Sequence, residues 1–196
     1  MITTFMGVLA FALYLLYDIN SYRWRKALPR VFFAAGTLFL AAATAIDLWQ
    51  AAAAGALAAP VDRVLLAAAA LFGLALIYCL FFALPFSATY TRQSEGRRVY
   101  DGGVYALCRH PGILCFFGMY LPLAAAAFPC QLALNGPLFA LLDLAYALFQ
   151  DRVTFPRTFD DYAAYREKVP FLIPTGNSIR MARRTLIHRR SKEDKL

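Results

Sequence analysis

The sequence predicts an all-α protein that crosses a membrane several times, and three observations support this fold class. Of the 196 residues, 61% are apolar and 16% are charged, whereas a soluble domain is on average about half apolar and a quarter charged. The apolar residues gather in long runs, and the basic residues gather between them. This composition excludes a disordered chain, a collagen-like fibre and a small disulfide scaffold.

Five apolar runs predict a bundle of about five transmembrane helices. A helix needs about 17–25 residues to cross about 30 Å of hydrocarbon. The first and fourth runs are short by this standard, and Pro122 interrupts the fourth, so a bundle of four spans is the alternative. The first run lacks the basic start of a signal peptide, so we interpret it as a span. The runs cover residues 2–17, 31–48, 64–88, 113–128 and 132–149.

The placement of basic residues predicts the orientation of the chain. Basic segments follow the first run, lie between the third and fourth, and follow the fifth, whereas the other two connections carry little charge. Because basic segments stay on the cytoplasmic side, five spans put the N-terminus outside and the C-terminus inside. The net charge of +8 therefore reflects membrane topology.

The chain divides into three segments along its length. Residues 1–88 form N-terminal transmembrane helices, residues 89–175 hold most of the polar chemistry, and residues 176–196 form a basic tail on the cytoplasmic side. We expect the tail to meet anionic membrane lipids. It has no aromatic residues for base stacking, so we predict no nucleic-acid partner.

The cysteines and histidines predict neither a disulfide framework nor a metal site. None of the four cysteines forms a CxxC pair, and reduced thiols at different membrane depths are the expectation. Only His110 and His188 are available as imidazole ligands, and no cluster has the spacing of a zinc site.

The first polar segment, residues 97–114, predicts a tight turn followed by a helix start. Gly102 and Gly103 permit a positive φ, and Pro111 suits the first turn of the fourth span. Arg109 and His110 then lie at a helix N-terminus, where free N–H groups and the helix dipole favour an anion. The alternative is that these two side chains anchor the span at the headgroup layer.

The second polar segment, residues 150–174, predicts a cap over the cytoplasmic end of the bundle. Its acidic and aromatic residues indicate a short amphipathic helix, and the two prolines that follow Val169 indicate an extended stretch. Within the fifth span, Asp143 shares a helical face with Ala147 and Gln150. An ionisable residue at that depth faces protein or a water-filled cavity, so this strip points to a pocket or to structural hydrogen bonding.

At these two segments the sequence resembles the isoprenylcysteine carboxyl methyltransferase family and its relatives, which include phospholipid N-methyltransferases. The resemblance covers roughly residues 95–175. It rests on an ordered set of short motifs: Gly103-Val-Tyr105, Arg109-His-Pro-Gly-Ile113, Asp151, Phe159-Asp-Asp-Tyr-Ala-Ala-Tyr165 and Val169-Pro with Pro174.

The resemblance implies a small multispan enzyme that uses S-adenosylmethionine as methyl donor. It implies catalytic roles for Arg109, His110 and Asp151. Either Gln150 or Asp151 matches the family's acidic residue, because the Phe-to-Tyr spacing is one residue shorter here. The residues that it places around the cofactor are Val99, Tyr100, Gly103, Tyr105, His110, Pro111, Gly112, Ile113, Gln150 and Asp151.

The sequence also departs from the family pattern in ways that bear on the substrate. Ile113 stands where the family usually has Tyr, and Arg152 replaces the second acidic residue. The family's arginine that contacts the prenylcysteine carboxylate falls at Ala147 or Tyr146. The expected acceptor is therefore a lipid-like or small apolar molecule that enters from the bilayer, and the atom that is methylated stays open.

Two other functions compete with methyl transfer at this point. One is a sterol-reductase-like, NADPH-dependent membrane oxidoreductase, since similar proline-rich C-terminal signatures occur there. The other is a membrane scaffold without enzymatic activity. The predicted topology and the absence of a cleavable signal favour a bacterial plasma membrane, with the endoplasmic reticulum as the alternative.

Overall fold

The computed structural model of the chain describes residues 1–24, 30–83 and 98–193. These residues form helices and connecting turns without any β-strand, which confirms the predicted all-α class. The predicted boundary at residues 88 and 89, and the end of the third apolar run, lie outside the described residues.

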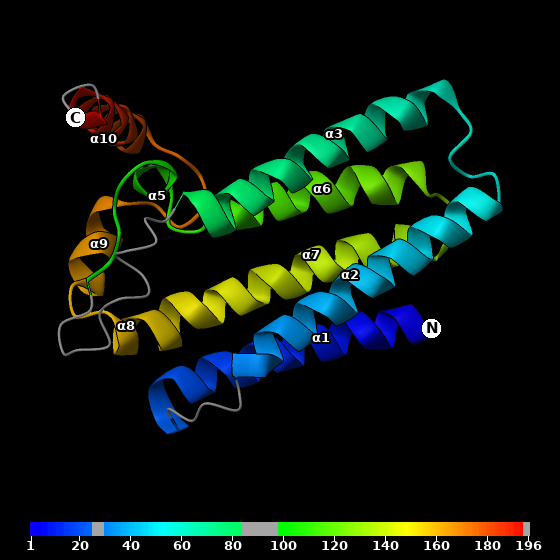
Figure 1. The fold of residues 1–196 in the computed structure, drawn as a ribbon, viewed down its shortest axis with the longest axis horizontal. Helices are drawn as coiled ribbons and strands as arrows, with labels where there is room; N and C mark the ends of the chain where they lie inside the picture. The colour runs from blue at the N-terminus through cyan, green and yellow to red at the C-terminus, as the bar shows by residue number, and fades with distance from the viewer. Residues whose placement is uncertain (25–29, 84–97, 194–196) are drawn as a thin grey trace.

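Five apolar helices lie side by side in one elongated bundle (Figure 1). They are α1 (Ile2–Ile19), α2 (Arg30–Ala53), α3 (Pro60–Ile77), α6 (Pro111–Ala126) and α7 (Gln131–Phe149). Three of them continue into π-helical turns, which are η1 (Asn20–Trp24), η2 (Tyr78–Phe82) and η3 (Gln150–Thr154). The shorter helix α5 (Val104–Leu107) and the helices α8 (Phe155–Thr158), α9 (Tyr162–Lys168) and α10 (Gly176–Glu193) gather at one end of the bundle, here called the polar end.

Four of the apolar helical stretches are long and apolar enough to cross a membrane, which is compatible with an integral membrane protein. They cover Ile2–Arg23, Val31–Ala53, Pro60–Phe82 and Gln131–Thr158. The fifth apolar helix, α6, has 16 residues and spans about 24 Å at 1.5 Å per residue. It packs along α3 and α7. All five predicted apolar helices are thus present, and α6 is the short one.

The third helix begins four residues before the apolar run that predicts it. Pro60 occupies the first turn, where its missing N–H costs nothing, and the Asp62 carboxylate accepts a hydrogen bond from the Ala59 N–H at 2.8 Å. The charges of Asp62 and Arg63 hide this helix start in the hydropathy pattern, although both residues belong to its first turn.

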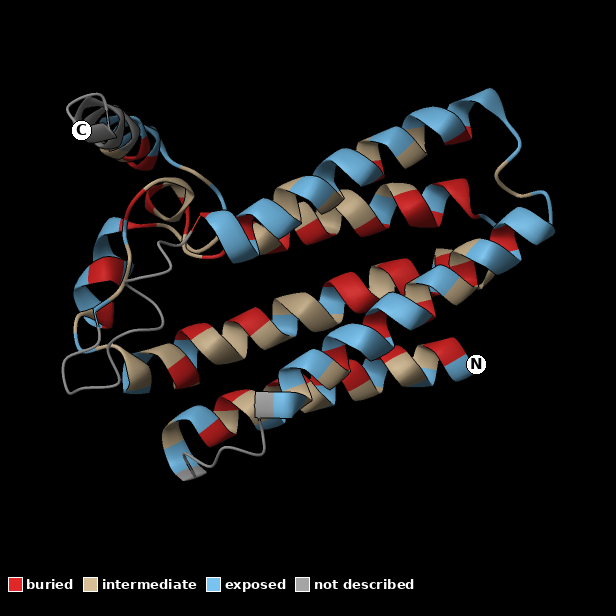
Figure 2. Cartoon of the chain, in the orientation of Figure 1, coloured by how far each residue is buried: buried red, intermediate tan, exposed pale blue. Residues whose placement is uncertain are grey.

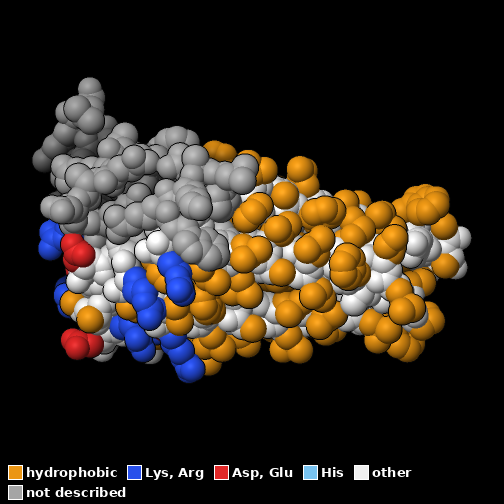
Figure 3. Space-filling model, turned by 90° about the horizontal axis from the view of Figure 1, so that it is seen from below, with side chains coloured by type: hydrophobic (Ala, Val, Ile, Leu, Met, Phe, Trp, Pro, Cys, Tyr) orange, Lys and Arg blue, Asp and Glu red, His pale blue; other side chains and the backbone are white. Residues whose placement is uncertain are grey.

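Apolar side chains cover the outside of the bundle as well as its interior. Figure 2 shows exposed residues along the outer helices and buried residues where the helices meet. Leu38, Leu71 and Leu134 each expose at least 66% of their surface. An apolar exterior of this extent is typical of a surface in contact with lipid. Figure 3 shows Lys and Arg side chains at the polar end, beside this apolar body.

The interior of the bundle combines aromatic rings with very small residues. Phe11, Phe116, Tyr120 and Phe139 pack in one buried cluster. A Cβ built on Gly136 would lie 2.9 Å from the Tyr120 carbonyl oxygen and 2.9 Å from the Ala124 Cβ. The absence of a side chain at this position therefore lets α7 approach the backbone of α6, as small residues do in membrane helix packing.

A polar network joins three helices at the other end of the bundle. The Asn135 amide donates to an Asp47 carboxylate oxygen at 2.6 Å and to the Thr3 hydroxyl at 3.1 Å. Thr4 donates to the Asn135 carbonyl at 2.8 Å. These bonds connect α1, α2 and α7, so they hold the first and last long helices side by side.

We expect Gly136→Ala to destabilise the protein by about 1–3 kcal/mol, because the added methyl group forces α6 and α7 apart. Gly73→Ala is the matched control, since its Cβ would meet only the flexible Met119 side chain, at 3.3 Å. Thermal unfolding of the detergent-solubilised variants measures both effects. Equal unfolding midpoints for the two variants would contradict the close packing of α6 on α7.

Candidate functional site

The central feature of the polar end is a buried ion pair between Arg109 and Asp151. The Arg109 Nε donates to Asp151 Oδ1 at 2.7 Å, and Nη2 donates to Oδ2 at 3.2 Å. The two side chains expose only 9% and 5% of their surface. Arg109 lies just before α6, and Asp151 lies just after α7, so the pair closes the polar end of these two neighbouring helices.

Two further side chains complete the surroundings of the Asp151 carboxylate. The Tyr162 hydroxyl donates to Oδ1 at 2.6 Å, and the Arg166 Nε lies 3.7 Å from Oδ2. Burial, together with the neighbouring carboxylate, raises the pKa of Tyr162 well above its ordinary value, so the hydroxyl stays protonated and keeps donating. Both residues belong to α9, which is thereby attached to η3.

Hydrogen bonds to backbone carbonyls attach the residues that follow α9 to the start of α6. The Arg109 Nη1 donates to the Val169 carbonyl at 2.6 Å. The backbone N–H of Arg109 donates to the Pro170 carbonyl at 2.9 Å, and that of His110 donates to the Phe171 carbonyl at 3.2 Å. The predicted return of this segment to the bundle is therefore confirmed. Val169 is extended, as predicted, whereas the chain bends at residues 171–173.

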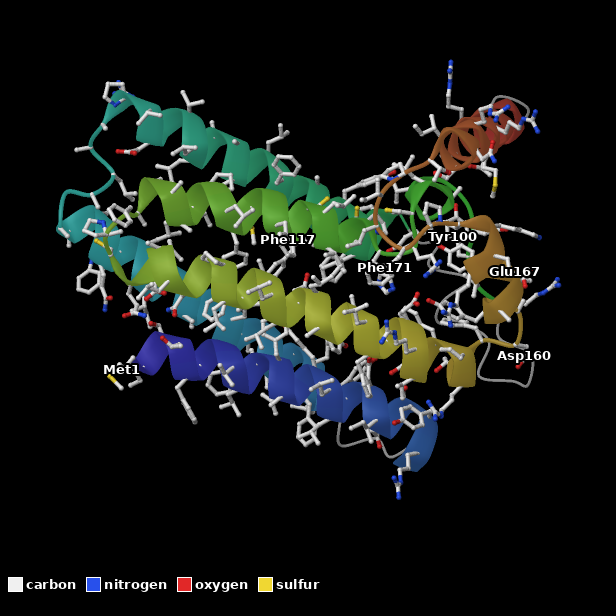
Figure 4. All side chains as sticks on the ribbon, turned by 180° about the vertical axis from the view of Figure 1, so that it is seen from behind. Met1, Tyr100, Phe117, Asp160, Glu167 and Phe171 are labelled. Carbon is white, nitrogen blue, oxygen red and sulfur yellow. The ribbon has the colours of Figure 1, made fainter. Side chains whose placement is uncertain are left out.

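His110 contacts two aromatic rings at the start of α6. Its imidazole stacks on the Phe155 ring, with 5.7 Å between centroids, and tilts against the Phe171 ring at 4.9 Å. Figure 4 shows Phe171 near the start of α6, at the end of the bundle opposite Met1. The residue is 8% exposed, and its Nε2 has no hydrogen-bond partner among the described residues. The nearest carboxylate oxygen, Asp151 Oδ1, lies 3.5 Å away.

This arrangement corrects one part of the sequence prediction. We expected Arg109 and His110 to attract an anion at the start of α6, and the polar strip that includes Gln150 to point to a pocket or to structural hydrogen bonding. The anion is the chain's own Asp151, and Asp151 faces His110 directly at near-contact distance. The physical reason is that a buried guanidinium needs a carboxylate, which Asp151 supplies in bidentate geometry.

The glycine turn before α5 takes the predicted conformation. Gly103 has φ +59°, and its N–H donates to the Thr185 hydroxyl of α10 at 3.0 Å. Pro111 occupies the first turn of α6, as predicted. Gly112 and Ile113 follow it, and Ile113 is 6% exposed. The start of α6 is thus assembled as the sequence predicts.

The aromatic residues Tyr100 and Tyr105, which the resemblance places around the cofactor, lie beside the Gly103 turn and make their contacts there, away from the Asp151 carboxylate. The Tyr105 hydroxyl donates to the Cys79 carbonyl at 2.9 Å, and the Tyr105 ring meets the Tyr100 ring edge-on at 6.3 Å. The Val99 N–H donates to an Asp161 oxygen at 2.8 Å, and the Val99 side chain packs against the buried tyrosines of α9. Val99 therefore belongs to the cap that α9 forms.

The structure separates Gln150 from Asp151. Asp151 faces Arg109 and His110, whereas Gln150 faces Asp18 of α1. Of the two residues that the motif spacing left open, only Asp151 therefore lies in the Arg109–His110 cluster. Asp143 lies seven residues before Gln150, within α7 and near Tyr14 of α1.

A surface hollow of about 430 Å³ lies elsewhere, between α9 and α10. None of the predicted site residues lines it. Its walls are Glu167, Lys168, Asn177, Arg180, Met181 and Arg184.

The described residues offer no obvious metal centre. Within residues 1–24, 30–83 and 98–193, no three His, Cys, Asp or Glu side chains gather as metal ligands. The four cysteines carry free thiols.

Two features of the site escape sequence reasoning. Phe155 and Phe171 contact His110, but nothing in their spacing distinguishes them from ordinary cap residues. Asp18 is 4% exposed and faces the end of α7. An acidic residue directly after the first apolar run is visible in the sequence and marks a position that needs a polar partner.

No family model, curated protein or solved structure matched this chain in the comparisons with known proteins.

We expect Tyr162→Phe to lower the free energy of unfolding by about 1.5–3 kcal/mol, because it removes a buried hydrogen bond to a charged carboxylate. Tyr165→Phe is the matched control. Its hydroxyl donates to the uncharged Tyr105 carbonyl at 2.6 Å, so the expected loss is about 0.5–1.5 kcal/mol. Chemical unfolding of both variants in detergent gives the comparison. A larger loss for Tyr165→Phe would contradict the importance assigned to the carboxylate.

Proposed function

We propose that the protein is an integral-membrane methyltransferase that uses S-adenosylmethionine and acts on a lipid-like or small apolar acceptor. The resemblance of residues 95–175 to the isoprenylcysteine carboxyl methyltransferase family motivates the proposal. The observation that carries it is the buried His110, which contacts two aromatic rings and whose Nε2 lies 3.5 Å from Asp151 Oδ1 without a well-formed hydrogen bond. The motifs that carry the resemblance supply both His110 and its neighbours Arg109 and Asp151.

The chemical groups around His110 support a ligand of this kind. A buried polar atom without a partner favours a ligand that hydrogen-bonds to it. S-adenosylmethionine has carboxylate, hydroxyl and adenine groups that can bond to the His110 Nε2. The resemblance assigns Tyr100, Tyr105 and the start of α6 to the same ligand, and aromatic faces such as these attract a sulfonium cation.

Arg109 and Asp151 have a positioning role in this proposal. The Asp151 carboxylate is already bonded to Arg109 and Tyr162, and Arg109 also bonds to the Val169 carbonyl. These side chains therefore hold His110 and the residues after α9 in place, while His110 binds the ligand. This differs from the direct catalytic role that the resemblance implies for all three.

Methyl transfer requires mainly that the chain binds and orients the reactants and excludes water. When bound, S-adenosylmethionine supplies an electrophilic methyl group. The aromatic side chains beside His110 and the cap formed by α9 limit the access of water to that end of the bundle. Alignment of donor and acceptor in a dry site accounts for much of the acceleration of such a transfer.

The apolar exterior of the helices supports an acceptor that arrives from the bilayer. In this proposal the polar end lies on the cytoplasmic side of a bacterial plasma membrane, where the cofactor is dissolved. The basic residues at that end support the orientation.

We expect S-adenosylmethionine to bind the detergent-solubilised protein with micromolar affinity. His110→Ala weakens binding about tenfold or more, because the partner of the ligand is lost. Asp151→Ala also loses binding, since Arg109 is released. Titration calorimetry measures the affinities, and Asp160→Asn, an exposed site, is the control that keeps full affinity.

Two outcomes contradict the proposal. One is a well-folded protein that shows no heat of binding with S-adenosylmethionine. The other is a rise in the unfolding midpoint with NADPH and none with S-adenosylhomocysteine, which would support an oxidoreductase.

A further inference from the structure

The hollow at the polar end of the bundle has mainly basic walls. It lies between α9 and α10, and its volume of about 430 Å³ is typical of a site for a small molecule. Three of its six lining side chains are cationic, and one is acidic. We call it the basic hollow, and its lining residues are Glu167, Lys168, Asn177, Arg180, Met181 and Arg184.

Both walls of the basic hollow are attached to the short helix α5, which lies between them (Figure 1). The Tyr165 hydroxyl of α9 donates to the Tyr105 carbonyl at 2.6 Å. The Gly103 N–H, just before α5, donates to the Thr185 hydroxyl of α10 at 3.0 Å. Met181 of α10 also packs against the buried tyrosine cluster of α9. These contacts fix the position of α10 relative to α9.

One face of α10 supplies most of the lining side chains. The four lining residues of this helix follow the i, i+3, i+4, i+7 spacing that places side chains on a single helical face. The Arg180 guanidinium donates to the Asn177 side-chain oxygen and, at 3.3 Å, to the Gly176 carbonyl. These two bonds hold the guanidinium beside the first turn of α10, at the edge of the hollow.

The chain itself does not balance the positive charge of the basic hollow. Among the residues that the structure describes, none of its three cations forms an ion pair with a carboxylate. Three cations against the single carboxylate of Glu167 leave two positive charges in excess. The sequence of α10 has no acidic residue before Glu193. The hollow therefore favours an anion with more than one negative charge.

The donor groups indicate which kind of anion fits the hollow. The planar fork of an arginine matches the oxygens of a phosphate group, and a lysine adds a point charge to the same group. A phosphate monoester carries about 1.5–2 negative charges at pH 7, whereas a carboxylate or a phosphodiester carries a single charge. The charge excess of the basic hollow therefore matches a phosphate monoester best.

We propose that the basic hollow binds a phosphate monoester group. Arg180 and Arg184 donate to the phosphate oxygens from α10, and Lys168 adds a charge from the end of α9. The group is carried either by a membrane lipid or by a soluble molecule, since both present the same chemistry. No residue of the His110 cluster lines the hollow, so the inference goes beyond the proposed function and holds whether or not methyl transfer occurs.

The test compares two monoesters with one diester. The full-length protein in dodecyl maltoside is titrated at pH 7 with dioctanoyl phosphatidic acid, glycerol 3-phosphate or dioctanoyl phosphatidylglycerol, which is the diester. Native mass spectrometry measures the ligand bound, and thermal melting measures the unfolding midpoint.

We expect phosphatidic acid to raise the midpoint and to bind about fivefold more tightly than phosphatidylglycerol, because its headgroup carries more charge. The glycerol 3-phosphate titration then distinguishes the two sources. An affinity equal to that of phosphatidic acid assigns the group to a soluble molecule, and a much lower affinity assigns it to a lipid.

Variants with exposed side chains locate the site without disturbing the core. Arg180→Gln and Arg184→Gln each weaken phosphatidic acid binding about fivefold, because each removes a charged donor to the phosphate. Arg183→Gln is the matched control, since it removes the same charge from α10 but does not line the hollow, and it leaves the affinity unchanged. Glu167→Gln strengthens binding about twofold, because it removes the acidic side chain from the wall.

Three results would overturn the inference. In the first, neither monoester binds. In the second, phosphatidic acid and phosphatidylglycerol bind equally well, so that the hollow does not select a monoester. In the third, Arg183→Gln weakens binding as much as Arg180→Gln and Arg184→Gln do, so that the charge of α10 acts without a defined site.

Discussion

The buried ion pair of Arg109 and Asp151 is the interaction on which the polar end of the molecule depends. Each charge alone would cost several kcal/mol to bury, so neither side chain is stable in its position without the other. Because Arg109 also bonds to the Val169 carbonyl, the same guanidinium connects the start of α6, the end of α7 and the cap. Three segments that are far apart in the sequence are therefore held by one side chain.

The Arg109–Asp151 ion pair also bears on the hydrogen bonding of the neighbouring His110 imidazole. The bidentate contact and the Tyr162 hydroxyl bond to the Asp151 oxygens, and the His110 Nε2 lies 3.5 Å from Oδ1. Phe155 and Phe171 both contact the imidazole ring. The Arg109–Asp151 pair is thus fully bonded, whereas the neighbouring His110 Nε2 makes no well-formed hydrogen bond. In the proposed function, this fully bonded support fixes the group that meets the ligand.

Much of the fold follows from local patterns, whereas the site depends on partners that the sequence does not pair. The apolar runs predicted all five bundle helices, and Pro111 and Gly103 predicted a helix start and a left-handed turn, because these preferences are local. The partner of Arg109 is 42 residues away and was not predictable from spacing. Asp18 was overlooked, since its seam with α7 exists only once the two helices pack.

A double-mutant cycle tests the central claim most directly. The free energy of unfolding is measured for Arg109→Gln, Asp151→Asn and the double variant in the same detergent. If the ion pair holds the polar end together, each single variant loses about 3–5 kcal/mol, and the double variant loses much less than the sum, because neither charge is then left unpaired. Strictly additive losses would contradict the account, since they would mean that the two side chains stabilise the protein independently.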